Sequence, residues 1–368
     1  VRSGVLSSVH AFAVDPRRGI FILMIMMIFT GGALSLFALR AGTLRQGGLF
    51  SPISREGALV LNNVLLATAT GTVLVGTLYP LALEAIDGDK ISVGAPYFNS
   101  TFVPLMIPLL LAVPFGSFLG WKRGDLRAAA ERLMFAAAIA VLAAIAVLAI
   151  HGRGPWLAPL ALAIGVWVMA GAVSEVLFRA RIGKAGPAEV FRRLRNLPRS
   201  NWGTALAHFG LGMTVVGIVG TTAWRTEHIV ALKPGDTSDI AGYTVKFHGT
   251  ENTKGPNYTA LIGRFDVTRS GAPFTTLYAA KRIYDAPRQA TTEAAIHASA
   301  AGDLYLVLGD PQKNGGYAVR MYFNPLVRFI WIGAVVMFLG GGLSLTDRRL
   351  RVGAPARTSS RPRKAATA

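Results

Sequence analysis

Two histidines, His208 and His10, are the residues of this sequence best suited to bind a metal. His208 lies in an uncharged run of twenty residues, GTALAHFGLGMTVVGIVGTT (203–222). At about 1.5 Å per residue, a helix of that length crosses the roughly 30 Å hydrocarbon core of a bilayer. An ionisable side chain in lipid costs free energy unless it has a partner, and neutral imidazole is a common metal ligand, for haem iron among others. The alternative is a hydrogen bond across a helix pair, beside Gly210 and Gly212.

The second histidine, His10, lies in a short amphipathic stretch, SVHAFAVDPRRG (8–19), ahead of the first apolar segment. It could ligate a metal at the outer face, or it could be an interfacial histidine without a special role. The sequence contains no nucleophile–base motif, phosphate loop, HExxH motif or carboxylate pair, so its catalytic residues stay unknown. It also contains no cysteine, so any thiol chemistry must use the thiols of a partner.

The elements that must position these histidines are apolar segments long enough to cross a membrane. Of the 368 residues, 52% are hydrophobic and 15% are charged, and the mean hydropathy is +0.44. This composition excludes an ordinary soluble protein and predicts a polytopic α-helical membrane protein, because a backbone in lipid must satisfy its own hydrogen bonds. We expect about seven transmembrane helices, near 20–39, 58–83, 101–121, 133–150, 155–178, 203–222 and 326–345.

Serine and proline mark several expected helix boundaries. Ser54 is expected to cap the second helix, which should stop near Pro80. The third segment, 101–121, contains three prolines and should be kinked or broken.

The composition changes after residue 222. Short apolar runs alternate with polar residues, as in YTVKFHG and DLYLVLGD, which predicts strands. We therefore expect an outward-facing β-rich domain, in which 291–296 forms a short helix or turn. The predicted order is a periplasmic lead-in with His10 (1–19), a six-helix transmembrane bundle (20–222), the β-rich domain (223–325), a last transmembrane helix (326–345) and a basic cytoplasmic tail (346–368).

The net charge of +19 is distributed unevenly among the loops. Fourteen basic residues lie in the loops 40–57, 122–132 and 179–202, and only two in the loops 84–100 and 151–154. The positive-inside rule therefore places the N-terminus and the β-rich domain outside, and the tail in the cytoplasm. Because the charge is explained by topology and by attraction to membrane lipid headgroups, no nucleic-acid partner is expected.

The sequence resembles a known family in a series of ordered segments. They are SGVLSSVHAFA (3–13), SREGALVLNNVLL (54–66), GTLYPLALEA (76–85), KISVGAPYFN (90–99), ALAHFG (205–210), PNYTA (256–260), KRIYDAPRQATTEAAI (281–296), DLYLVLGD (303–310) and NPLVRFIWIGAVVMFLGG (324–341). Almost the whole chain is similar to the C-terminal half of the CcmF family of bacterial cytochrome c maturation proteins. The related NrfE proteins share much of the pattern.

The resemblance implies a haem lyase subunit in the bacterial inner (cytoplasmic) membrane. Such subunits take haem from the chaperone CcmE and help join it by thioether bonds to the CxxCH cysteines of apocytochrome c, presented by CcmH and CcmI. By position in the motif SSVHAF, His10 matches an outer-face ligand of the incoming haem. By position in ALAHFG, His208 matches a ligand of a permanent b-type haem (haem b) in the membrane.

The sequence also departs from the family pattern. It has no tryptophan-rich WGGxWxWD-type run, and the other histidine of each expected pair has no match. We therefore expect a fragment or one half of a split protein, whose partner includes the missing N-terminal half. Whether thioether formation is catalysed or only templated is left open. The alternatives are a non-catalytic scaffold that docks CcmH or the apocytochrome, and a haem or solute transporter.

Overall fold

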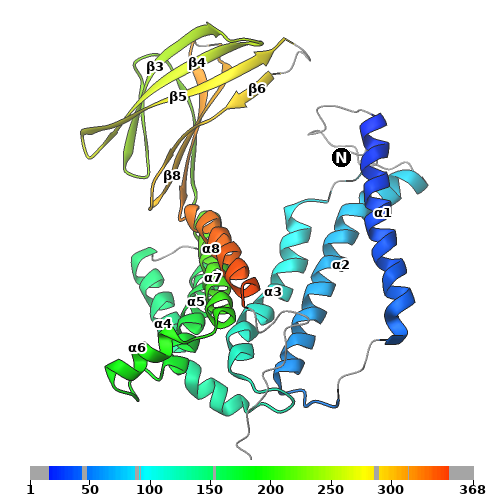
Figure 1. Cartoon of the computed structure of the whole chain (residues 1–368). Helices are drawn as coiled ribbons and strands as arrows, with labels where there is room; N and C mark the ends of the chain where they lie inside the picture. Colours follow the sequence, from blue (N-terminus) through cyan, green and yellow to red (C-terminus); the bar gives the residue numbers. More distant parts are fainter. Residues whose placement is uncertain are drawn as a thin grey trace, which may run out of the picture. The chain divides into compact units, whose positions relative to one another are not determined.

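The structure is a computed structural model of the chain, and it describes residues 16–43, 48–87, 91, 93–151, 155–285, 290–313 and 315–347. Seven of its helices are long and apolar enough to cross a membrane. These helices are α1 (Pro16–Arg40), α2 (Arg55–Asp87), α3 (Ala95–Phe118), α4 (Leu126–His151), α5 (Ala158–Ala180), α7 (Arg199–Trp224) and α8 (Arg328–Leu345). All seven expected apolar segments are thus helical, which confirms the predicted fold class (Figure 1).

One expectation about proline was wrong, and for another, one of its two alternatives is excluded. Helix α2 does not stop near Pro80 but continues to Asp87 with the proline inside it. Helix α3 is not broken by its three prolines, since it is continuous from Ala95 to Phe118. An internal proline removes one backbone hydrogen bond, and a long apolar helix in a membrane tolerates that loss.

The chain divides into two compact units, residues 1–109 with 119–125, and residues 110–118 with 126–368. In the first unit, the start of α2 and the turn 119–125 hydrogen-bond to each other. The Arg55 amide donates to the Gly120 carbonyl (2.9 Å), and the Lys122 amide donates to the Glu56 carboxylate (2.8 Å). Ser54 is fully buried and its hydroxyl accepts from the Gly57 amide at 3.0 Å, so the predicted helix cap is confirmed.

In the second unit, α7 lies between α5 and α8, and a short basic helix, α6 (Pro187–Arg195), precedes it. Sequence reasoning missed α6 because its nine residues, PAEVFRRLR, are too few and too polar to stand out as an apolar segment. Figure 1 shows α6 lying across the ends of α5 and α7, at the opposite end of α7 from the strands.

Residues 226–325 form two antiparallel sheets that pack face to face. The strands are β1 (Thr226–Leu232), β2 (Thr237–Ile240), β3 (Tyr243–Lys254), β4 (Tyr258–Arg269), β5 (Ala272–Tyr284), β6 (Ala290–Glu293), β7 (Ala295–Ala298), β8 (Gly302–Pro311) and β9 (Tyr317–Pro325). One sheet has the order β1-β9-β8-β7 and the other β2-β3-β4-β5-β6. Residues from both sheets share one core, in which the rings of Phe247 and Phe265 stack at 5.0 Å. Alternate residues of β8 are buried, as the period-two pattern predicts.

The expectation of a short helix or turn at 291–296 was wrong. These residues belong to β6 and β7, where Glu293 pairs with Ala280 of one sheet and Ala295 pairs with Leu306 of the other. The chain crosses between the sheets at Ala294, and pairing with both sheets outweighs the helix propensity of the sequence EAA.

The sandwich is joined to the helices by two adjacent connections. Helix α7 leads directly into β1, and β9 leads into α8 through Leu326 and Val327. The Leu326 amide donates to the Ala301 carbonyl (3.1 Å), and the Thr221 hydroxyl donates to the Pro325 carbonyl (3.1 Å). Because β1 and β9 also pair with each other, both connections are hydrogen-bonded to their surroundings.

A polar cluster lies on the outer face of the second sheet, around Asp266. The Thr276 hydroxyl donates to one carboxylate oxygen (2.8 Å), and Nε2 of His248 lies 2.8 Å from the other. The hydrogen bond from Thr276 is the main cause that lowers the pKa of Asp266. Burial opposes that effect, and the charges of Arg264 and His248 add to it. A lowered pKa in the folded state contributes stability above the pKa of the unfolded chain, and this contribution is lost as the pH falls through the folded pKa.

The substitution Thr276→Val should therefore raise the pKa of Asp266 toward its unfolded value, so the carboxylate should contribute less stability at neutral pH and its contribution should be fully lost at a higher pH than in the wild type. The titration can be followed through the carboxyl ¹³C shift of labelled aspartate. The matched control is Thr244→Val, which removes a hydroxyl bonded to Asp239 instead. An Asp266 titration unchanged by Thr276→Val would contradict the assignment.

Candidate functional site

His208 lies within α7, in the half of the helix nearer α6, and its side chain is half-buried. Thr204, Leu211 and Val215 recur at helical spacing on the same face and are also half-buried. His208 thus shares its face of α7 with small and aliphatic residues, on a stretch of helix that carries no formal charge.

Glycines bring α7 into backbone contact with α8 along another of its faces. A Cβ built at Gly203 would lie 2.5 Å from the Gly340 carbonyl oxygen, and one at Gly210 would lie 2.5 Å from that of Gly333. The reverse contacts are equally close, since a Cβ at Gly333 would meet the Gly210 carbonyl at 2.5 Å. Only glycine fits at these crossing points, and such close approach is how helices associate in lipid.

A second glycine contact joins α7 to α5. A Cβ at Gly212 would lie 2.6 Å from the Gly165 carbonyl oxygen, and a Cβ at Gly165 would lie 3.0 Å from that of Gly212. Gly210 and Gly212 therefore pack on different helices, and His208 is on the adjacent turn. The sequence analysis noted these two glycines beside the histidine but could not assign each to its partner helix.

Polar contacts fix α7 at both ends. The carboxylate of Asp347, which follows α8 and is 6% exposed, accepts from the Ser200 amide at 3.0 Å. An acidic group at a helix N-terminus satisfies a free amide and complements the helix dipole. At the other end, the Thr221 hydroxyl donates to the Pro325 carbonyl at 3.1 Å. The position of His208 is consequently set by contacts on two sides and at two ends.

Of the two candidate ligands the structure describes only His208, because His10 lies outside the described residues. Among the described residues, no group of three or more His, Cys, Asp or Glu side chains could hold a metal ion. The histidines 228, 248 and 297 belong to strands β1, β3 and β7, and His151 ends α4. Within the described part of the chain, His208 is the histidine placed well inside an apolar helix.

Sequence reasoning missed one buried acidic residue. Glu175 of α5 is 3% exposed, and its Oε1 accepts two hydrogen bonds from Arg179, at 2.8 and 2.9 Å. Its Oε2 is buried and has no hydrogen-bond partner among the described residues. An acidic residue inside an apolar segment is itself a sign of a polar interaction, and it could have been identified from the sequence.

The chemistry of His208 is compatible with binding of haem iron, since imidazole is a usual ligand of that metal. The small and aliphatic residues on the same face of α7 are compatible with a porphyrin ring beside them. The described apolar helices contribute this one imidazole away from their ends, so any further ligand would have to come from elsewhere.

Seven apolar helices of spanning length and a two-sheet β domain define the class of protein: a polytopic membrane protein with a β-sandwich domain. Residues 223–325 match the family model described as the CcmF C-terminal beta-sandwich. The chain is 56% identical over 358 residues to the cytochrome c-type biogenesis protein CycK of Rhizobium meliloti, and the match covers 97% of this chain and 53% of that protein.

It is also 40% identical over 359 residues to the cytochrome c-type biogenesis protein CcmF of Escherichia coli, covering 95% of this chain and 53% of that one. Among solved structures, the Cytochrome c Heme Lyase CcmF has a similar fold, with a TM-score of 0.63 at 22% identity over 91% of this chain and 51% of that one. The chain belongs to the CcmF family of cytochrome c-type biogenesis proteins, which confirms the resemblance seen in the sequence, and it spans about half the length of its relatives.

The glycine contacts that position α7 give a direct test. We expect Gly210→Ala to destabilise the protein by about 1–3 kcal/mol, because its Cβ would overlap the α8 backbone. The control is Gly341→Ala on α8, where a Cβ would meet nothing within 4 Å. Thermal unfolding in detergent measures both, and equal midpoints for the two variants would show that the α7–α8 contact is not tight.

Proposed function

We propose that this chain is the haem-binding C-terminal part of a cytochrome c haem lyase subunit in the bacterial inner membrane. The observation that carries the proposal is the half-buried imidazole of His208, held on a helix that glycine contacts fix between two others. Membership of the CcmF family supports it, because a relative of the same fold bears the name cytochrome c haem lyase.

In this proposal His208 would supply one nitrogen ligand to the iron of a b-type haem in the membrane, and a further ligand would come from the part of the relatives' length that this chain lacks. A haem bound in this way would supply one-electron redox chemistry. The glycine contacts of α7 would hold the helix that carries His208 in place, and the apolar residues on the same face would keep water away.

His10 is proposed to ligate the incoming haem at the outer face, before its attachment to the CxxCH cysteines of apocytochrome c. The chain has no cysteine, so the thiols that form the thioether bonds belong to the apocytochrome. The proposed partners are the haem chaperone CcmE, the proteins CcmH and CcmI, and the N-terminal half of the same subunit. The proposed topology places the β-sandwich in the periplasm and the C-terminus in the cytoplasm, as the loop charges indicate.

The first test removes the membrane ligand. When the chain is co-expressed with the N-terminal half, His208→Ala should abolish the b-type absorbance of the purified complex, because one of two axial ligands is lost. The matched control is His228→Ala, which changes an exposed histidine of β1 and should leave the spectrum intact. An unchanged absorbance spectrum in the His208→Ala variant would contradict the proposal.

The second test concerns the outer face. His10→Ala should lower the yield of mature cytochrome c by at least about tenfold, the order seen when a site loses a supporting ligand contact. The membrane b-type haem should be largely retained, since a different residue ligates it. Holocytochrome yield, read by haem-stained gels, measures the effect. A normal yield would contradict the assigned role.

A further inference from the structure

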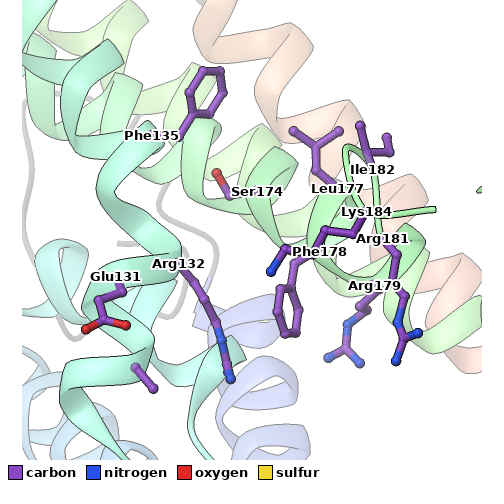
Figure 2. A pocket seen from close by; sticks show the side chains of 11 residues that line it. Glu131, Arg132, Phe135, Ser174, Leu177, Phe178, Arg179, Arg181, Ile182 and Lys184 are labelled. Carbon is purple, nitrogen blue, oxygen red and sulfur yellow. The ribbon is translucent and has the colours of Figure 1, made fainter.

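A groove of about 830 Å³ lies between α4 and α5, at the end of α5 that leads into the basic loop. Its inner part is apolar, with Phe135 of α4 and Leu177 of α5. Its outer part is basic and is lined by Arg132, Arg181 and Lys184 (Figure 2). The lining thus changes from apolar to cationic along the direction of the helices.

The groove is lined by four basic side chains and one acidic side chain, and the charge of Arg181 also acts on Glu189 of α6. The two other charged side chains of the groove are already paired, since Glu131 binds Arg127 (3.2 Å) and Arg179 binds Glu175 (2.8 Å). No ion pair joins Arg132, Arg181 or Lys184 to any residue that the structure describes. Arg132 instead lies 4.5 Å over the ring of Phe178, which holds its guanidinium at the groove.

A buried hydroxyl provides a second, independent observation. Ser174 lines the groove, is 6% exposed, and its Oγ is buried without a hydrogen-bond partner among the described residues. A serine inside a helix commonly donates to the carbonyl four residues before it, and Ser174 does not. Figure 2 shows the hydroxyl directed toward Phe135 of α4, into the space between the two helices. The unpaired hydroxyl of Ser174 therefore indicates that a ligand in the groove would supply a hydrogen-bond acceptor.

The depth of the groove in the membrane indicates which kind of anionic ligand its basic side chains would bind. Helix α6, which packs near the same end of α5, is amphipathic and basic, and its Phe191 is 67% exposed. A short basic amphipathic helix with an exposed aromatic side chain is typical of the membrane interface. Basic pockets between transmembrane helices at that level bind anionic lipid headgroups, whereas a free phosphate would leave the apolar inner part of the groove empty.

We propose that the α4–α5 groove binds one anionic phospholipid. Its phosphate lies among Arg132, Arg181 and Lys184, and an acyl chain follows Phe135 and Leu177. Ser174 is one helical turn, about 6 Å along the axis, deeper than Phe178, so its hydroxyl donates to an ester oxygen of the glycerol backbone. This proposal does not depend on the haem site.

The test uses the full chain, purified in detergent and reconstituted in nanodiscs of phosphatidylcholine with or without phosphatidylglycerol. Native mass spectrometry should find one phosphatidylglycerol retained on the wild-type chain. The double variant Arg181→Gln/Lys184→Gln should bind it at least about tenfold more weakly, because each basic residue near an anionic headgroup contributes to binding. The matched control is Arg192→Gln/Arg195→Gln, which removes the same charge from α6 without altering the groove.

Retention in the control and loss in the groove variant would support the site. Equal loss of the lipid in both variants would overturn the proposal, since the lipid would then be attracted by the whole basic surface. Equal retention of the lipid in both variants would also overturn it, since the lipid would then bind elsewhere. Displacement of the lipid by millimolar inorganic phosphate would also overturn it in favour of a free-anion site. Circular dichroism shows whether the double variant is folded; if it is not, Lys184→Gln alone should weaken binding about threefold, and unchanged binding would count against the proposal.

Discussion

The arrangement of the second unit depends on backbone contact between helices at glycine. In lipid, apolar side chains gain little by meeting one another, so close packing of backbones and a few polar contacts must hold helices together. Helix α7 makes such contacts with α8 through Gly203 and Gly210 and with α5 through Gly212. His208 and its aliphatic neighbours lie on another face of α7, so these contacts decide where the residue is placed along the helix bundle.

Much of the fold could be predicted because the physics of the membrane leaves few choices. Hydropathy alone located all seven long helices, and period-two alternation located the β domain. The predictions that failed concerned features that are decided by tertiary contacts. Pro80 did not end its helix, and residues 291–296 joined two sheets despite a helix-forming composition. Helix α6 was missed because its nine mostly polar residues do not stand out as an apolar segment.

At the candidate site, too, residue types could be predicted from the sequence, whereas tertiary contacts could not. The type and surroundings of His208 could be recognised from the sequence, because a titratable residue in an uncharged segment is unusual. Which glycine contacts which helix could not be predicted from the sequence, since the crossing geometry of α5, α7 and α8 decides it. Glu175 was visible in the sequence as an acidic residue within an apolar run, and only the structure shows that Arg179 binds one of its oxygens while the other is buried.

The two connections between the helices and the sandwich have a mechanical consequence. Leu326 adopts a left-handed backbone conformation (φ 56°), and its side chain lies against Gly220, where a Cβ would come within 2.9 Å of it. A domain tethered by one linker can swivel, but here two strands that are paired with each other enter α7 and α8 at neighbouring points. A force applied to the sandwich would therefore act on both α7 and α8 and would not be relieved by rotation about a single linker.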